Sequence, residues 1–189
     1  NNSEWKKTMS LVNNNRDLNS FIAIGGFEWS HNYFGHMNIL FIKSRTCRNK
    51  HNNLESFYYW IKKKNAIAQF NHPGREDGLF NQFQYNSSLS KNIILIETGN
   101  KKDGNTDNRY LPYYSQALQS GWRLAPTNNL DNHSLQSNSH RTVIIAKDNS
   151  RESLIHAIKS RRVYSSDDYN MNVTFKLKHH WMGSVVSLI

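Results

Sequence analysis

The chain alternates short apolar runs with longer segments in which apolar and polar residues are interspersed. Short, mainly apolar runs are typical of strands buried in a sheet that is covered on both faces. Six runs fit this description: residues 21–27, 37–42, 66–70, 92–96, 122–125 and 142–146. We therefore predict a largely buried sheet.

Four longer segments predict helices that present one apolar face: residues 4–18, 54–64, 110–119 and 150–160. Asn65 suits the C-cap of the second helix, and Ser150 suits the N-cap of the last one. Strands that alternate with helices predict an α/β fold, barrel-like, with its functional site at the C-terminal ends of the strands.

Polar stretches at 43–53, 99–108 and 126–140 predict surface loops between these elements. The pattern changes near the C-terminus. Residues 172–177 alternate between apolar and polar as an exposed edge strand does, and residues 185–189 could pair with them. We therefore expect a separate β segment over residues 169–189.

Composition narrows the possible classes of protein. The chain has 189 residues, of which 37% are hydrophobic and 20% are charged, which suits one domain with a real core. No apolar run approaches the ~18 residues of a membrane span, and no signal peptide is evident, so the compartment stays open between cytoplasmic and secreted. The single cysteine, Cys47, excludes an internal disulfide and a cysteine-based zinc site.

The chain is strongly basic, with a formal net charge of +10. This balance favours anionic partners such as phosphates, nucleic acid or acidic glycans. A solvated basic surface without a dedicated partner is the alternative.

Candidate metal ligands follow the predicted strands. Glu28 follows the first run, His36 opens the second, His72 follows the third, and Asp131 and His133 follow the run at 122–125. An Asp-x-His in an extended segment places both side chains on one face. Imidazoles and carboxylates of this kind hold divalent metals.

Each of these residues also has a purely structural interpretation. Asn-His-Pro-Gly around His72 is good turn chemistry, and Glu28 could be a surface carboxylate. His31 lies close to Glu28 in the sequence and could line the same site. A phosphate-binding glycine loop, a Gly-x-Ser-x-Gly elbow, and kinase and dinucleotide motifs are absent.

Five motifs in this order resemble the polymerase and histidinol phosphatase (PHP) superfamily of metal-dependent phosphoesterases, in particular the branch of carbaryl-hydrolase-type metallohydrolases. They are Gly26-Phe27-Glu28-Trp29-Ser30, Gly35-His36-Met37-Asn38, Ala68 to Gly74, Gly121-Trp122 to Asn132-His133, and Arg161-Arg162-Val163-Tyr164. The resemblance covers roughly residues 20–189.

The resemblance implies a distorted (β/α)7 barrel with one to three divalent metal ions, zinc, manganese or iron. Glu28 would bridge two metals, and His36 and His72 would complete the protein ligands of one of them. Asp131 would bind the neighbouring metal, and His133 would bind that one or a third.

The resemblance also implies hydrolysis of an ester by a water molecule that the metals acidify. Arg75 and Arg162 are candidates to hold an anionic substrate through their guanidinium groups. Residues 1–168 would form the metallohydrolase domain, and the β segment at 169–189 would begin a β-sandwich domain.

One departure from the family pattern matters. The family opens with a His-x-His on its first strand, and no histidine precedes Glu28 here. We therefore expect a barrel without its first strands, either because the chain is a fragment or because the protein has lost them. A partner segment, upstream or on another chain, could supply the missing ligands. Three functions stay open: phosphoester hydrolysis, hydrolysis of a carbamate or carboxylic ester at the same site, and a degenerate domain that binds nucleic acid or protein.

Overall fold

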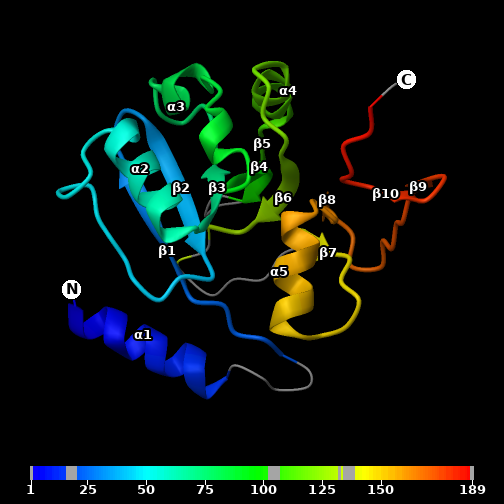
Figure 1. Cartoon of the computed structure of the whole chain (residues 1–189), viewed down its shortest axis with the longest axis horizontal. Helices are drawn as coiled ribbons and strands as arrows, with labels where there is room; N and C mark the ends of the chain where they lie inside the picture. Colours follow the sequence, from blue (N-terminus) through cyan, green and yellow to red (C-terminus); the bar gives the residue numbers. More distant parts are fainter. Residues whose placement is uncertain (1, 16–20, 102–106, 132, 134–138, 188–189) are drawn as a thin grey trace.

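A mixed six-stranded sheet forms the centre of the molecule (Figure 1). The computed structural model describes residues 2–15, 21–101, 107–131, 133 and 139–187. Five strands follow one another in the sheet and a sixth, β6, pairs with β4: β1 (Gly26–His31), β2 (Gly35–Leu40), β3 (Ile67–Asn71), β4 (Ile93–Lys101), β5 (Asp107–Arg109) and β6 (Ala125–Asn129). The predicted α/β class is confirmed.

The described residues form no closed barrel, so that part of the prediction is wrong. The β1–β2, β2–β3 and β4–β5 pairs are antiparallel, and the β3–β4 and β4–β6 pairs are parallel. A short turn at residues 32–34 joins β1 to β2. A parallel connection would need a crossover there, usually a helix.

The first strand lies further along the chain than predicted. We expected it at 21–27, but residues 22–25 are irregular and β1 continues to His31. Glu28 therefore lies within the strand, opposite Asn38 of β2, and does not follow it. The alternation of Phe27, Trp29 and His31 with polar or small residues is the period of a half-buried strand, which the continuous apolar run obscured.

Helices cover both faces of the sheet. On one face, α2 (Leu54–Lys64), α3 (Leu79–Gln82) and α4 (Leu111–Gln119) enclose the larger apolar cluster, which includes Phe57, Phe70 and Trp122. On the other face, α5 (Arg151–Lys159) packs a smaller cluster around Ile67 and Leu95. Along β3, Ala68 and Phe70 belong to the first cluster, so Gln69 and Asn71 share a face with Ile67. This second face is apolar near α5 and polar toward the end of β3.

The helix predictions are largely confirmed. Helix α2 has the predicted bounds, and Asn65 ends it in the left-handed conformation. Ser150 caps α5 by accepting a hydrogen bond from the backbone N–H of Ser153. Helix α1 (Asn2–Asn14) packs Trp5 edge-on against Phe27, and the end of the predicted segment 4–18 lies outside the described residues.

Helix α3 is unusual because it is a left-handed turn. Residues 79–83 all have positive φ angles, from 40° to 55°. Left-handed backbone costs about 1–2 kcal/mol per residue, so packing has to hold it. Leu79, Phe80 and Phe83 are buried, and the backbone N–H of Phe80 donates to the carbonyl of Phe34 in the β1–β2 turn.

Several strands of the second half differ from prediction. Strand β6 extends into the predicted loop 126–140, and β8 (Val163–Ser166), which the sequence did not predict, pairs antiparallel with β7 (Arg141–Ile144). Polar strand residues caused the first error, because their side chains enter a buried hydrogen-bond network. The predicted pairing of 172–177 with 185–189 is wrong over the described residues. Instead β9 (Lys176–Leu177) pairs with β10 (His180–Trp181).

None of the helices in the described part of the chain has the length and apolar character that crossing a bilayer requires.

Candidate metal centre

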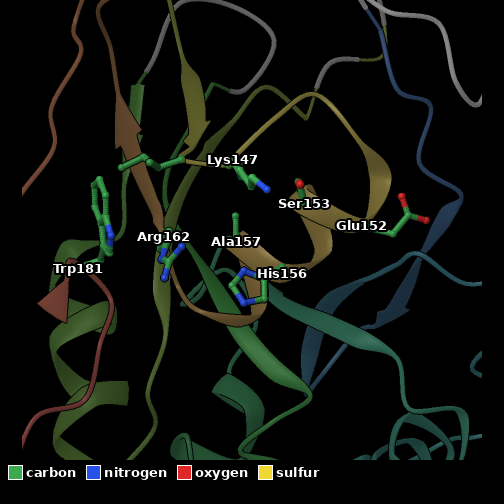
Figure 2. Close-up of a pocket in the computed structure, with 9 residues that line it drawn as sticks. Lys147, Glu152, Ser153, His156, Ala157, Arg162 and Trp181 are labelled. Atoms are coloured by element: carbon green, nitrogen blue, oxygen red, sulfur yellow. The ribbon is translucent and has the colours of Figure 1, made fainter. Parts of the chain in front are cut away.

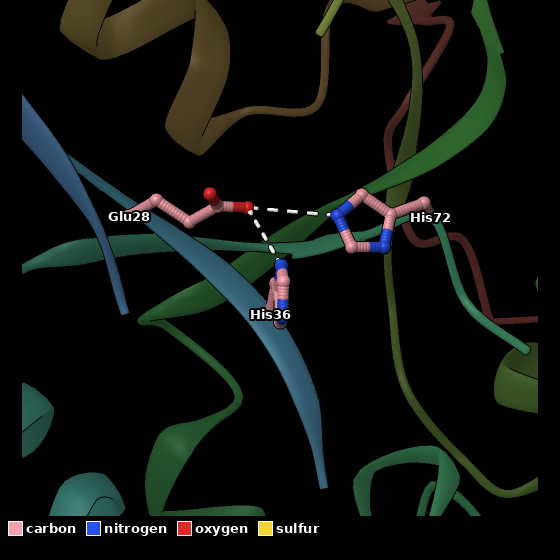
Figure 3. Close-up of side chains that lie close together, drawn as sticks. All are labelled: Glu28, His36 and His72. Atoms are coloured by element: carbon pink, nitrogen blue, oxygen red, sulfur yellow. Dashed lines mark ion pairs between the residues drawn. The ribbon is translucent and has the colours of Figure 1, made fainter. Parts of the chain in front are cut away.

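Glu28, His36 and His72 come together at the edge of the sheet where β3 ends (Figure 3). Because β2 runs antiparallel to β3, its beginning lies beside the end of β3, and His36 is opposite Asn71. One potential ligand atom from each residue lies within 4.8 Å of the others. Glu28 Oε1 is 3.4 Å from His36 Nδ1 and 3.6 Å from His72 Nε2. Among the described residues, these three side chains form the group of potential metal ligands that lie close enough together to share one ion.

A chain of buried amides fixes the Glu28 carboxylate. Asn71 Nδ2 donates to Glu28 Oε1 at 2.8 Å, and Gln69 Nε2 donates to Asn71 Oδ1 at 2.8 Å. Thr127 Oγ1 in turn donates to Gln69 Oε1 at 3.0 Å. Outer hydrogen bonds of this kind orient metal ligands and tune their affinity.

The electrostatics favour a charged carboxylate. Desolvation opposes ionisation of Glu28, but its interactions with His36, His72 and Asn71 outweigh that cost and hold the pKa of Glu28 well below its ordinary value. The interaction with Glu28 raises the pKa of His36, while desolvation partly opposes this shift. The site thus offers one anionic oxygen and two imidazoles.

A second carboxylate, Glu76, lies on the other side of the two imidazoles. Its oxygens are 3.6 Å from His36 Nε2 and 3.9 Å from His72 Nδ1, beyond the length of an ordinary hydrogen bond. His72 Nδ1 is buried without a hydrogen-bond partner among the described residues. A buried nitrogen without a partner is rare in proteins and fits a ring that serves an ion. The residues present therefore suit a divalent metal.

Glu97, in the middle of β4, holds the backbone of His72. Its carboxylate accepts hydrogen bonds from the backbone N–H of His72 and from the amides of Asn100 and Asn129. Burial raises the pKa of Glu97, and these three donors partly oppose the shift. His72 has a φ of 29°, an unfavourable backbone conformation for a residue with a side chain, and the hydrogen bond from its N–H to Glu97 helps to hold it.

Sequence reasoning did not select Glu97, Glu76 or Asn71. Glu97 follows an apolar run just as the other candidates do, which was an available signal. Glu76 lies four residues after His72, but in a turn and not in a helix, so its spacing indicated nothing. Asn71 was visible only as part of a turn motif.

Asp131 and His133 lie outside the three-residue group. Arg75 Nη1 donates to Asp131 Oδ2 at 2.9 Å, and Arg75 Nε donates to the hydroxyl of Tyr110 at 3.1 Å. His133 is exposed, with Nδ1 3.1 Å from the backbone carbonyl of Asp131. The assignment of Asp131 and His133 as ligands to further metals stays a prediction.

His31 is bound to backbone on both sides of its ring. Its Nδ1 accepts from the N–H groups of Tyr33 and Phe34, so its Nε2 is the donor to the carbonyl of Asn52, at 3.0 Å. The ring also stacks on Trp29. These contacts organise the β1–β2 turn and occupy both nitrogens. Arg162 lies elsewhere, against Trp181 of β10.

Comparison with known proteins supports the fold. No protein-family model matches the chain, and no curated protein does. One similar solved structure is a two-domain protein from Bacteroides vulgatus ATCC 8482 described as containing a predicted PHP-like metal-dependent phosphoesterase. The TM-score is 0.55 at 19% sequence identity, over 77% of this chain and 44% of that one. The chain therefore spans less than half of that protein, and at this identity the likeness concerns the fold alone.

Proposed function

We propose that this chain forms part of a metal-dependent hydrolase that cleaves phosphoesters with a metal-activated water. The observation that carries the proposal is the convergence of Glu28, His36 and His72 on one edge of the sheet. The likeness in fold to a PHP-like phosphoesterase supports it. Zinc, manganese and iron are all compatible with two imidazoles and a carboxylate.

Glu28, His36 and His72 would hold the ion. When bound, the metal would polarise the ester and lower the pKa of a water molecule toward neutrality. Three protein ligands leave coordination positions open, as in catalytic sites and unlike closed structural ones. Asn71 would keep the Glu28 oxygen in place, and Glu97 would keep the backbone of His72 in place.

Arg75 would hold the phosphate. Its guanidinium is partly exposed and lies near enough to His36 that its charge slightly opposes the rise in the pKa of that imidazole, which the interaction with Glu28 causes. It is held by Tyr110 and Asp131 in the described structure. An incoming phosphate would compete with Asp131 for this fork, and the freed Asp131, with His133, would be available to a second metal together with imidazoles from a partner segment.

Replacing His72 tests the proposal. We expect His72→Ala to lose bound metal and to lower hydrolysis of an aryl phosphate by about 100-fold or more, because one of three ligands is gone. Elemental analysis gives the metal content, and release of the coloured phenol gives the rate. His179→Ala, an exposed histidine of the β9–β10 turn, is the matched control. Unchanged turnover in His72→Ala would contradict the proposal.

A second candidate function is binding without turnover. The ion pair between Asp131 and Arg75 favours this candidate, because Asp131 is then engaged and does not serve a metal. In the described part of the chain, one group of metal donors is then assembled, Glu28, His36 and His72. Metal uptake without hydrolysis, together with salt-sensitive binding of an oligonucleotide to this basic protein, would favour this candidate over the first. A carbamate or carboxylic ester as substrate is a third outcome, and aryl carbamates in the same assay would detect it.

A further inference from the structure

A cavity of about 570 Å³ lies on the α5 side of the molecule, apart from the metal centre (Figure 2). Its wall comes from the residues after β7, from one face of α5, from the turn before β8 and from β10. Its chemically active lining residues are Lys147, Glu152, Ser153, His156, Arg162 and Trp181. It shares no lining residue with the three-residue metal group, and its size is that of a small-molecule site.

Three basic side chains from three different segments line this cavity: Lys147, His156 and Arg162. Over the described ranges, no carboxylate forms an ion pair with any of them. Glu152 lines one end, and its carboxylate points away from the other labelled side chains (Figure 2). Asp148, which lies near Lys147, accepts a hydrogen bond from the Ser150 hydroxyl. The cavity therefore has an excess of positive charge.

Backbone hydrogen bonds hold these segments in place. The N–H of Arg162 donates to the carbonyl of Ala157 at the end of α5, and the carbonyl of Arg162 accepts from the N–H of Ile145 after β7. The Arg162 guanidinium lies 5.8 Å from the ring centroid of Trp181. Because hydrogen bonds already fix the backbone of these segments, little conformational entropy is lost there when an anion binds.

Part of the cavity wall is apolar. Ile145, Ala146 and Ala157 line the cavity together with the ring of Trp181. A bare inorganic ion would leave these apolar side chains in contact with water, so the lining suits an anion that carries an organic group. Ser153 also lines the cavity, one helical turn from His156 on the same face of α5, and its side chain interacts with the Asp148 carboxylate.

We propose that this cavity binds a small phosphate monoester, with the phosphate among Lys147, His156 and Arg162 and the organic group against Trp181. A phosphate monoester carries a charge of about −1.5 to −2 and three acceptor oxygens, which matches several donors from different directions better than a carboxylate does. Arginine can grip two of those oxygens at once. This site is independent of the proposed hydrolysis.

Titration calorimetry with phenyl phosphate, in EDTA and at low salt, tests the site. We expect a Kd below about 1 mM for the unmodified chain, weaker binding of inorganic phosphate, and none of phenol at the same concentrations. Arg162→Gln and Lys147→Gln should each weaken binding by about tenfold or more, since each loses a charge-assisted hydrogen bond. Lys159→Gln, which removes an exposed charge of α5 outside the cavity, should change the Kd by less than about twofold.

Two further measurements keep the result clear. Binding should persist in His72→Ala, because the metal centre is a separate site. Loss of binding there, equal losses in all three glutamine variants, or no weakening in Lys147→Gln would overturn the proposal. Thermal unfolding of each variant shows whether it is folded. Because Lys147 is exposed, we expect Lys147→Gln to fold normally.

Discussion

At the scale of single residues, the metal centre depends on side chains that are themselves held by others. Glu28 is partly exposed, yet it is fixed by Asn71, which is fixed by Gln69. His72 is buried, and Glu97 holds its backbone. The ligands are therefore only as well placed as the amides and the carboxylate behind them.

Asn71→Ala should weaken metal binding without removing a ligand. We expect a loss of about 10–100-fold in metal affinity, because Glu28 loses the donor that orients it. The variant should also lose about 1–3 kcal/mol of unfolding free energy, since Gln69 Nε2 is left buried without its acceptor. Metal titration and thermal unfolding measure the two effects. Asn13→Ala, on the exposed face of α1, should show neither.

Arg75→Gln should change substrate preference. For an aryl phosphate we expect KM to rise by about tenfold or more, because a charge-assisted hydrogen bond to phosphate is lost. A neutral aryl carbamate has no such group, so any turnover of it should stay within about twofold. Steady-state kinetics on both substrates checks this. Equal effects on the two would assign Arg75 to the support of Asp131 alone.

At the scale of elements, the β1–β2 hairpin and the left-handed turn α3 form one packed unit. Gly35 in this hairpin has a φ of 108°, and a Cβ there would lie 2.6 Å from Phe80 Cε1. Phe80 is buried in that left-handed turn, and His36 is the next residue along β2. The position of one metal ligand is thus coupled to a backbone conformation more than 40 residues away.

Gly35→Ala should destabilise the protein and disturb the metal site together. The strained φ and the contact with Phe80 should cost about 1–3 kcal/mol, or roughly 2–4 °C in Tm for each kcal/mol. Ser30→Ala, at an exposed position of the same hairpin, is the control. If the contact is the cause, combining Gly35→Ala with Phe80→Leu should cost less than the sum of the two single changes.

The elements differ in how far sequence could predict them. The prediction of helix α2 was correct because its apolar periodicity and its C-cap are local features of the sequence. Strand β6 was missed because Thr127, Asn128 and Asn129 have the composition of a loop, and only the buried partners Gln69 and Glu97 make them suitable for a strand. Likewise, Glu28, His36 and His72 could be named as ligands from motifs, but the Arg75–Asp131 pair joins residues far apart in sequence and needed the structure.

At the scale of the whole molecule, the proposed metal centre lies on the six-stranded sheet, and the cavity beside α5 lies at the smaller sheets. The metal donors belong to the antiparallel half, β1 to β3, while the cavity belongs to β7, α5, β8 and β10. An ion at the first site would join strands that are otherwise connected by backbone hydrogen bonds and by the amide network. Its stabilising effect should therefore be uneven across the chain.

Adding zinc to the metal-free protein should raise stability mainly in that half. At a free zinc concentration of 100 times Kd, the gain should be about 2.7 kcal/mol. Hydrogen exchange should slow in β1, β2 and β3 and change little in β7 to β10, because local opening is governed by local contacts. The same measurements on His72→Ala should show no zinc effect. Uniform protection in both proteins would point to non-specific binding.

The three donors also lie within one short stretch of chain, between Glu28 and His72. Bringing them together requires one hairpin and the connection through α2, so the entropy of loop closure is small compared with that of a site gathered from distant segments. A β-hairpin forms within about 1–10 μs, long before slow steps such as proline isomerisation. On a growing polypeptide this whole set of donors is synthesised before α4, α5 and the final strands. The ion can therefore act as an early organiser of folding and not only as a late addition to a finished protein.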